Sequence, residues 1–347
     1  MHDPAPVHAV APLRISFVGG GTDFPHWYEE HGGAVLSSTI DHFVRVRIWP
    51  REDRQVRVRS VDLGQLVAYH LDEGPEYDGV MDLAKAAIER IGVRGGLDME
   101  IASEAPAGSG LGGSSALVTA VAAGLAMLGG RVYTAEELAR LAYAIEREDL
   151  GISGGWQDQY AAAFGGFNLL EFSGGRVAIT PIRVAAGALD RLQQCLLLCY
   201  TGAVRRDVGL IDAQISMFRG GREETLLGMK QLTEMAYAMR DAVESGDVDE
   251  LGPMLDDAFE SKKRMNPRVA EGTPIESMLS AARDAGATGG KICGAGGGGY
   301  LLIAGPPAAR PRVRARLEGM GGQFAAFAFY PGGVRASRGD RVWTPAP

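Results

Sequence analysis

Several short segments of the chain alternate between hydrophobic and polar residues, and this period of two predicts β-strands with one buried face. Leu97, Met99 and Ile101 are the apolar positions of one such segment. The segments 45–49 and 55–59 alternate strictly on either side of a PREDR turn, which predicts a β-hairpin with a solvated, basic face. Further strands are predicted at 166–172, 192–200, 300–304 and 324–330.

Longer stretches have helical rather than strand patterns. Residues 116–128 are almost wholly Ala, Val, Leu and Met, which is too long for a typical strand and rich in helix formers. Thr134 and Glu137 stand in capping-box register at the start of a second helix. This second helix is predicted at 134–149, and further helices are predicted at 78–91, 223–244, 247–263 and 274–285. The change from mixed strands to mostly helices near 185–205 predicts a domain boundary.

A glycine-rich loop precedes the helix predicted at 116–128, and residues 106–116 read PAGSGLGGSSA. Glycines let the backbone approach a ligand closely, and the N–H groups and dipole at a helix start favour an anion. The loop has no lysine, which excludes the Walker type, and its match to G-x-G-x-x-G is too unspecific to indicate a dinucleotide site. The loop therefore predicts a phosphate site, the alternative being a turn that only packs a helix against a sheet.

Residues 106–116 resemble the second motif of the GHMP kinases, a family named after galactokinase, homoserine kinase, mevalonate kinase and phosphomevalonate kinase. RISFVGGGTD at 14–23 resembles the first motif of that family, and GKICGAGGGG at 290–299 resembles the third. The three motifs stand in the family's order and span most of the chain. Three further segments are most similar to the kinases of heptose 7-phosphate and of fucose, namely GGGTDFP at 19–25, HGGAVL at 31–36 and GGWQDQ at 154–159.

The resemblance implies an α+β fold with two lobes. The N-terminal, nucleotide-binding lobe would resemble the second domain of ribosomal protein S5 and comprise residues 1–190. The C-terminal lobe, a ferredoxin-like α/β unit, would comprise residues 191–347. The active site would then lie in the cleft between the two lobes.

Composition narrows the possible functions further. The net charge of −8 argues against general binding to nucleic acid or to acidic membranes. The apolar run 116–128 is shorter than the roughly 18 residues that a membrane helix needs, and the start of the chain lacks the pattern of a signal peptide. The three cysteines are expected to be reduced, buried thiols. We therefore expect a cytoplasmic enzyme that acts on a small molecule as a monomer or homodimer.

The resemblance assigns ATP to the glycine-rich loop and Mg²⁺ to a carboxylate near it. The residues expected to contact the nucleotide are Pro106, Gly108, Ser109, Gly110, Leu111, Gly112, Gly113, Ser114 and Ser115. Glu146 lies near the end of the helix predicted at 134–149, where the helix dipole disfavours an acid. A cation would offset that cost, although Arg147 beside it would do so in part.

The family's metal position falls on Glu146 together with a serine of the second motif. An ungapped alignment makes that serine Ser114, and Ser115 remains the alternative. A carboxylate, a hydroxyl and phosphate oxygens suit Mg²⁺, which keeps several waters and does not require a complete cage of protein ligands.

The resemblance also assigns the catalytic roles. Asp158 would accept the proton of the attacking sugar hydroxyl, and Arg14 would hold Asp158 ionised and offset the charge that develops on the transferred phosphoryl group. Without the resemblance, Asp158 has the position of a helix cap and Arg14 that of a surface arginine at a strand edge.

The expected contacts to the sugar come from the first and third motifs and from the segments around them. They are Gly20, Gly21, Thr22, Asp23, His31, Gly32, Gly33, Asp41, Asp158, Arg205, Gly296 and Gly297. An acceptor that already carries phosphate needs a cation away from the reacting hydroxyl. Arg205 is the expected one, and Lys262 and Lys263 are the alternatives.

The resemblance therefore implies an ATP- and Mg²⁺-dependent kinase that phosphorylates the anomeric hydroxyl of D-glycero-α-D-manno-heptose 7-phosphate to the 1,7-bisphosphate. Two alternatives stay open. The first is an L-fucose-type sugar 1-kinase, whose acceptor has no phosphate. The second is an inactive regulator that binds sugar and nucleotide on the same fold, against which the retention of Glu146, Asp158 and Arg14 argues.

Overall fold

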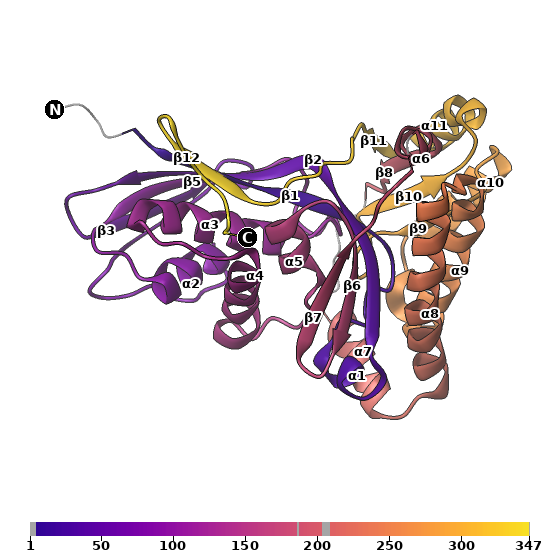
Figure 1. The fold of residues 1–347 in the computed structure, drawn as a ribbon, viewed down its shortest axis with the longest axis horizontal. Coiled ribbons are helices and arrows are strands. Elements are labelled where there is room, and N and C mark those ends of the chain that lie inside the picture. Colours follow the sequence, from indigo (N-terminus) through magenta and orange to yellow (C-terminus); the bar gives the residue numbers. More distant parts are fainter. Residues whose placement is uncertain (1–4, 186, 203–208, 347) are drawn as a thin grey trace.

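The computed structural model describes residues 5–185, 187–202 and 209–346, which form two β-sheets and the helices that cover them (Figure 1). Nine strands in these residues form the larger sheet: β1 (Val7–Val18), β2 (Gly33–Pro50), β3 (Gln55–Ser60), β4 (Gln65–His70), β5 (Leu97–Ser103), β6 (Phe167–Ser173), β7 (Arg176–Pro181), β12 (Arg335–Arg338) and β13 (Arg341–Trp343). The strand order is β13-β12-β1-β2-β5-β3-β4. The long β2 also pairs with β6 through its first residues, and β6 pairs with β7.

The smaller sheet lies at the other end of the molecule (Figure 1). Its four strands in the described residues are β8 (Leu196–Tyr200), β9 (Gly289–Ile292), β10 (Tyr300–Ala304) and β11 (Gln323–Ala325). They are antiparallel in the order β11-β8-β10-β9. The glycine-rich residues 294–299 connect β9 to β10, so the third sequence motif lies at the turn between β9, at the edge of this sheet, and its neighbour β10.

The helices are α1 (Pro25–His31), α2 (Asp82–Ile91), α3 (Gly113–Gly129), α4 (Ala135–Ala144), α5 (Gln157–Phe164), α6 (Ala188–Cys195), α7 (Leu210–Arg219), α8 (Glu223–Ser245), α9 (Leu251–Met265), α10 (Ile275–Asp284) and α11 (Arg310–Glu318). Helix α3 packs against β1 and β2, and α2, α4 and α5 pack against α3. Helices α8 and α9 pack against each other, with α8 on β2 and α9 on β9. This helix pair therefore connects the two sheets.

Helix α3 approaches the larger sheet closely because its sequence is so poor in large side chains. A Cβ on Gly124 would lie 2.8 Å from Cδ1 of Ile48, and 3.4 Å from the Cβ of Ala9. The small residues thus set the distance between helix and sheet, and they hold the start of α3 beside the strand that contains Arg14.

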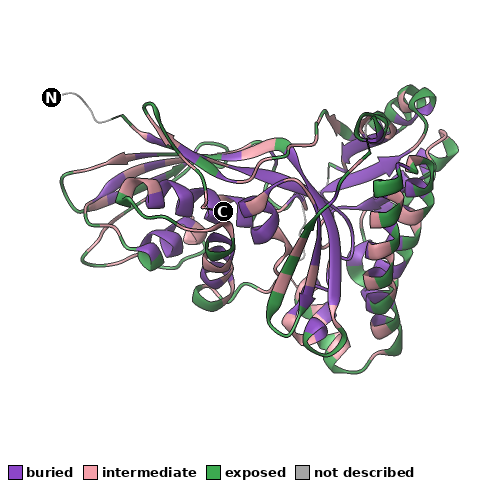
Figure 2. Cartoon of the chain, viewed as in Figure 1, coloured by how far each residue is buried: buried purple, intermediate pink, exposed green. Residues whose placement is uncertain are grey.

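Buried residues form a core that continues from one sheet to the other (Figure 2). Leu13 of β1, Leu198 of β8 and Leu255 of α9 belong to the same cluster of buried residues. A second, smaller cluster lies under α10 and α11 and includes Ile275 and Leu317. Because apolar contacts are continuous between the sheets, the two parts of the chain form one packed body.

The structure confirms most of the predicted elements and corrects others. The strand at 97–101, the helix at 116–128 and the strand at 300–304 are β5, α3 and β10. The hairpin predicted from 45–49 and 55–59 is wrong, because β5 lies between β2 and β3 and pairs with both. Alternation of side chains fixes which face of a strand is buried, but it does not fix the neighbouring strand.

Another correction concerns the strand predicted at 192–200. Residues up to Cys195 form α6, and the strand β8 begins only at Leu196. The division into domains at residue 190 remains a prediction. The smaller sheet begins after that position, whereas β12 and β13, near the end of the chain, pair with the larger sheet through β1.

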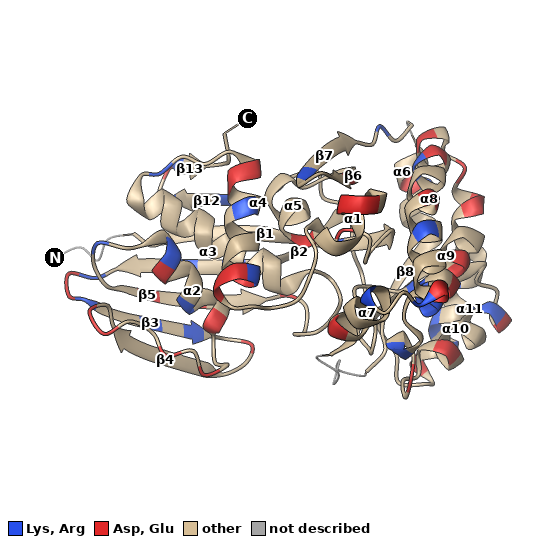
Figure 3. Ribbon diagram, turned by 90° about the horizontal axis from the view of Figure 1, so that it is seen from below, with Lys and Arg blue, Asp and Glu red and all other residues tan. Residues whose placement is uncertain are grey.

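Charged residues of both signs are mixed over the surface helices α8 to α11, as Figure 3 shows. In the part of the chain that the structure describes, no helix is both long and apolar enough to span a membrane.

Candidate active site

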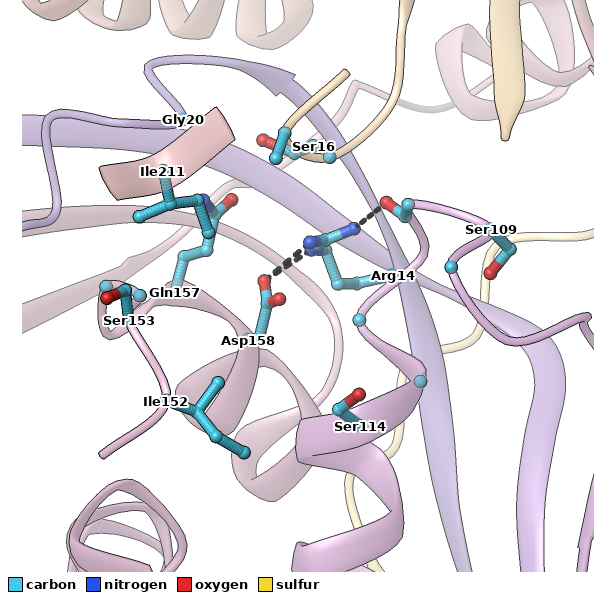
Figure 4. Close-up of a pocket in the computed structure, with 18 of the residues that line it drawn as sticks. Arg14, Ser16, Gly20, Ser109, Ser114, Ile152, Ser153, Gln157, Asp158 and Ile211 are labelled. Carbon is cyan, nitrogen blue, oxygen red and sulfur yellow. Dashed lines mark hydrogen bonds and ion pairs between the residues drawn. The ribbon is translucent and has the colours of Figure 1, made fainter. Parts of the chain in front are cut away.

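A cavity of about 640 Å³ opens where the three sequence motifs meet (Figure 4). Its walls come from β1 and the glycines after it, from the loop before α3, and from the segment that leads into α5. The third motif closes the cavity through residues 294–296, and Lys262 of α9 and Lys291 of β9 also line it. The motifs are far apart in the sequence, and the fold brings them to one place.

Arg14 and Asp158 face each other inside this cavity (Figure 4). Nε of Arg14 donates to Oδ1 of Asp158 at 2.8 Å, and Nη2 lies 2.6 Å from the same oxygen. Nη1 of Arg14 donates to the carbonyl oxygen of Gly110 at 2.6 Å. The guanidinium is buried, and the Asp158 side chain keeps 25% of its surface exposed. Arg14 therefore fixes the carboxylate relative to the glycine-rich loop.

The loop at 106–112 is docked on the third motif through backbone atoms. Gly110 has a φ of +81°, and a Cβ on it would lie 2.4 Å from the carbonyl oxygen of Cys293. The backbone N–H of Tyr300 donates to the carbonyl oxygen of Ser109 at 3.0 Å. Only glycine fits such a close approach with a positive φ. The second and third motifs thus form one rigid wall of the cavity.

The start of α3 faces the same cavity. Gly112 takes the N-cap position with a φ of +75°, and no side chain caps the helix. The first-turn N–H groups of a helix lack partners within the helix and attract an anion. Ser114 lines the cavity, whereas the hydroxyl of Ser115 is buried and donates to Oε2 of Glu146 at 3.0 Å.

Glu146 lies in a π-helical turn, Ile145–Asp149, that continues α4. Its carboxylate is buried, and Oε2 accepts from Ser115 and Gln159 and lies 3.0 Å from Nη2 of Arg147. Burial raises the pKa of Glu146 above its usual range, while Arg147 and the Ser115 hydroxyl oppose that rise. The other oxygen, Oε1, is buried without a hydrogen-bond partner among the described residues.

An orphaned carboxylate oxygen beside a serine hydroxyl fits a small divalent cation. In the described ranges no cluster of three or more His, Cys, Asp or Glu side chains could hold a metal. A cation here would therefore take few protein ligands and complete its shell with phosphate oxygens and water, as Mg²⁺ does. Glu146 itself does not line the cavity, whereas Ser114 and Arg147 do.

Asp23 is a buried carboxylate that also lines the cavity. Oδ1 accepts from the backbone N–H of Gly21 at 3.0 Å, and Oδ2 accepts from that of Gln157 at 3.0 Å. Burial raises the pKa of Asp23, and the nearby charge of Asp158 adds to the rise. Asp23 thus joins the first motif to the segment that holds Asp158.

Of the predicted sugar contacts, the structure brings Gly20, Gly21, Asp23, Asp158 and Gly296 to the cavity. It does not place Thr22, His31, Gly32, Gly33, Asp41 or Gly297 on the cavity wall. The residues predicted to contact the nucleotide all line the cavity except Leu111 and Ser115.

The residues away from the cavity have structural partners. The hydroxyl of Thr22 donates to the carbonyl oxygens of Gly19 and Ala34, which ties the first motif to β2. His31 ends α1 and packs against Trp27 with 4.3 Å between the ring centroids. Asp41 accepts from the backbone N–H of Ala328.

The same holds for the glycines that follow His31. Gly32 caps α1 with a positive φ, and a Cβ on Gly33 would lie 2.0 Å from the carbonyl oxygen of Thr22. These two residues are therefore required by the backbone of the turn.

The predicted cations for an acceptor phosphate are distributed differently. Arg205 lies outside the described residues. Lys262 is buried and lines the cavity. Lys263 points to the surface, where its Nζ lies 2.8 Å from both Glu260 and Glu276.

Sequence reasoning missed several residues of the cavity. Lys291 lies inside the third motif, and its positive charge in a glycine-rich segment could have identified it as a site residue. Gln157 and Gln214 had no distinguishing signal, and Gln214 is buried with its Nε2 donating to the carbonyl oxygen of Gly21 at 3.1 Å.

Sequence reasoning also missed an apolar part of the cavity wall. Its residues include Leu63, Met81, Leu83, Ala105 and Leu117. Apolar side chains in a cavity wall suit a nucleobase.

Comparison with known proteins agrees with this geometry. The family description "GHMP kinases N terminal domain" matches residues 79–166, and "GHMP kinases C terminal" matches residues 239–322. The chain is 32% identical to D-glycero-alpha-D-manno-heptose 7-phosphate kinase of Campylobacter jejuni, over 96% of this chain and 99% of that protein. It is 27% identical to the L-fucokinase/L-fucose-1-P guanylyltransferase of Bacteroides fragilis, over 88% of this chain and 35% of that larger protein.

A solved structure is similar over the whole chain. The crystal structure of a D-glycero-D-manno-heptose 1-phosphate kinase from Bacteroides thetaiotaomicron superposes with a TM-score of 0.79. The identity is 28%, and the match covers 96% of this chain and 99% of that one. The fold, with its cavity between the sheets, is thus that of these kinases.

Proposed function

Because the chain belongs to the GHMP kinase family, we propose that it transfers the γ-phosphoryl group of ATP to the anomeric hydroxyl of D-glycero-α-D-manno-heptose 7-phosphate. The product would be the 1,7-bisphosphate, an intermediate for nucleotide-activated heptose. The observation that carries the proposal is the Arg14–Asp158 pair, which lies beside the glycine-rich loop in the shared cavity. The 32% identity to the heptose 7-phosphate kinase over nearly its full length supports the acceptor.

Asp158 manages the proton in this reaction. Both contacts from Arg14 go to Oδ1, so the lone pairs of Oδ2 have no donor among the described residues. A sugar hydroxyl in the cavity can donate its proton to that oxygen as it attacks. The new O–P bond then forms, the bond from the γ-phosphorus to the β–γ bridging oxygen breaks, and its electron pair leaves with ADP.

The glycine-rich loop and the start of α3 hold the phosphates of ATP. The free N–H groups of the first turn after Gly112 bind the phosphate anion, and the apolar part of the cavity wall at Leu63, Met81 and Leu83 receives the nucleobase. Ser114 and Glu146, with Ser115 as the alternative hydroxyl, would hold Mg²⁺. The ion neutralises phosphate charge when bound.

Asp23 and its neighbours orient the acceptor. The carboxylate holds the backbone of Gly21 and Gln157 in place, and its remaining lone pairs can accept sugar hydroxyls. Lys262 supplies a positive charge for a phosphate on the acceptor, and Arg205 is the second candidate. An L-fucose-type kinase would have no use for such a cation.

An inactive regulator is disfavoured by the Arg14–Asp158 geometry, since a binding protein needs no positioned base. The proposal further places the enzyme in the cytoplasm, where ATP is available, as a monomer or homodimer. The three cysteines are free thiols, which agrees with a reducing compartment.

A coupled assay for ADP release tests the acceptor. The purified enzyme, with ATP and Mg²⁺, is offered heptose 7-phosphate, L-fucose, mannose and galactose at matched concentrations. We expect the highest kcat/KM with heptose 7-phosphate. A higher value with L-fucose would replace the proposal with its alternative, and no turnover with any sugar would favour the regulator.

A further inference from the structure

Lys291 is a buried lysine in the wall of the catalytic cavity that no step above uses. It lies on β9 with 4% of its surface exposed. Its Nζ donates to the carbonyl oxygen of Ser16 at 2.8 Å and to that of Ile292 at 3.1 Å. A lysine ammonium has three N–H donors, so these bonds leave one for another acceptor.

The ammonium has no negative partner in residues 5–185, 187–202 and 209–346, since no carboxylate lies within ion-pair distance of it. A buried charge without a counter-charge is unfavourable, and neutral donors could make the same two bonds at lower cost. Arg14 nearby is already matched by Asp158. Lys291 therefore leaves this part of the cavity with an excess positive charge, which a bound anion would balance.

The position of Lys291 indicates which anion that is. Ser16, whose carbonyl it binds, lies two residues after Arg14 on β1, and the side chains of both residues line the cavity. On the other side, Lys291 leads into the turn at 294–296, which faces the glycine-rich loop. The lysine thus stands where the three motifs meet, beside the guanidinium that holds the base.

We propose that Lys291 is a second cation for the transferred phosphoryl group and acts beside Arg14. The assignment rests on the proposed kinase function. As charge develops on the phosphoryl oxygens in the transition state, the third N–H of the ammonium donates to one of them. Asp158 already offsets the charge of Arg14, so Lys291 supplies the net positive charge that the two cations together present to the phosphoryl group.

The protonation state of Lys291 gives an independent readout. Burial, with the charge of Arg14 adding to it, lowers the pKa of Lys291 to about 8. The other ionisable groups that face this region are Arg14, Asp158, Cys293, Lys262 and, on the α9 side of β9, Asp256. Burial raises the pKa of Cys293, so the thiol stays neutral where the lysine loses its proton.

The test compares Lys291→Met and Lys291→Gln with the wild type. Methionine removes the charge and the hydrogen bonds, whereas glutamine removes the charge and keeps a donor for the Ser16 carbonyl. Lys230→Met, on the exposed face of α8, is the matched control for the loss of one lysine charge. The readouts are the melting temperature, kcat and KM with heptose 7-phosphate, and kcat/KM from pH 6 to 10.

We expect kcat to fall about 10- to 100-fold in both Lys291 variants, with a smaller change in KM and an unchanged Lys230→Met control. The melting temperatures should stay near that of the wild type, since removing a buried charge offsets the lost hydrogen bonds. The wild-type kcat/KM should decline above about pH 8, and this decline should be absent from both variants.

Three results would overturn the assignment while leaving a wild-type kinase intact. Normal kcat in Lys291→Gln with a lower melting temperature in Lys291→Met would make the lysine a structural tie to β1. A rise in KM for heptose 7-phosphate at unchanged kcat would make it a contact for the acceptor's own phosphate. An unchanged alkaline decline in the variants would assign that decline to another group. Failure of the proposed function is a different outcome, in which the wild type itself has no kinase activity.

Discussion

Arg14 and Asp158 are 144 positions apart in the chain, yet Nε and Nη2 of the arginine both lie within 2.8 Å of a single carboxylate oxygen. The third contact of the guanidinium goes to the carbonyl oxygen of Gly110. One side chain thus connects the proposed base to the loop that we propose holds the phosphates.

The first prediction concerns Asp158 as the base. Asp158→Asn should lower kcat by about 10²- to 10⁴-fold, because the amide cannot accept the hydroxyl proton. Binding of ATP should remain nearly normal, since the glycine-rich loop is untouched. Steady-state kinetics and calorimetric titration with ATP measure the two quantities. Asp190→Asn on the exposed face of α6 is the control, and near-normal turnover in Asp158→Asn would exclude Asp158 from the reaction.

The second prediction concerns Glu146 as the metal ligand. Glu146→Gln should raise the Mg²⁺ concentration needed for half-maximal activity by at least about tenfold, because the charged ligand is lost. Without metal, the melting temperature should hold or rise, since a buried carboxylate with an orphaned oxygen is removed. Thermal unfolding in EDTA checks the second point. A large loss of stability in EDTA would show that Glu146 is structural.

The third prediction compares two neighbouring glycines of the loop. Gly110→Ala places a Cβ 2.4 Å from the Cys293 carbonyl oxygen at a φ of +81°, so it should weaken ATP binding and destabilise the fold by about 1–3 kcal/mol. A Cβ on Gly113 meets no protein atom within 4 Å, and the residue lies in the first turn of α3, so Gly113→Ala should leave the stability of the fold near that of the wild type. Chemical denaturation and ATP titration measure both variants. Equal losses of stability in the two variants would mean that the contact between the glycine-rich loop and the third motif does not stabilise the cavity.

The fourth prediction compares two adjacent lysines of α9. Lys262→Ala should raise the KM for heptose 7-phosphate about 10- to 100-fold, the loss expected for a contact of about 1.5–3 kcal/mol to phosphate, with a smaller change in kcat. Lys263→Ala should leave both constants near the wild type, because Lys263 binds Glu260 and Glu276 at the surface. Arg205→Ala, measured in parallel, tests the candidate from the sequence. Equal effects of the two lysine variants would argue against Lys262 as the phosphate contact.

The fifth prediction concerns stability and pH. The pKa of Lys291 is about 8 in the folded protein and 10.5 in the unfolded chain. Between pH 8 and pH 10.5 the unfolded chain therefore binds more protons than the folded protein. The free energy of unfolding should therefore rise with pH in that window, by about 3 kcal/mol from this group. Lys291→Met should lack this rise. Urea denaturation of both proteins at pH 7.5 and 10 tests it, and parallel pH dependences would show that Lys291 is not the group responsible.

The sequence predicted the cavity best where a motif requires glycine. Gly110 combines a positive φ with a close approach to the backbone of Cys293, and Gly112 has a positive φ beside the side chain of Arg14. Glycine is the residue type that adopts such a backbone without strain. Such positions are visible in the sequence because their constraint is local. The strand β5 and helix α3 on either side of the loop were predicted for the same reason, since their side-chain patterns are uninterrupted.

Roles that depend on distant partners could not be predicted in the same way. Thr22 and Gly33 lie inside segments that resemble sugar-binding motifs, but the two segments contact each other. The Thr22 hydroxyl donates to the carbonyl oxygen of Ala34, and Gly33 packs against the carbonyl oxygen of Thr22. Which strand pairs with β3 depends on β5, about 40 residues later in the chain. Which of Ser114 and Ser115 faces Glu146 depends on how α3 is turned about its own axis relative to that residue. The structure shows the Ser115 hydroxyl hydrogen-bonded to Glu146, and the sequence does not contain this information.

The proposed enzyme transfers phosphate to the anomeric oxygen of heptose 7-phosphate, and ³¹P NMR of the reaction mixture detects that transfer at the oxygen concerned. With the wild-type enzyme, ATP and Mg²⁺, we predict one new sugar phosphorus resonance that couples to the anomeric proton and grows in step with ADP. Asp158→Asn should give almost none of it in the same time. A new resonance coupled to any other sugar proton, or release of inorganic phosphate alone, would rule out phosphorylation of the anomeric hydroxyl.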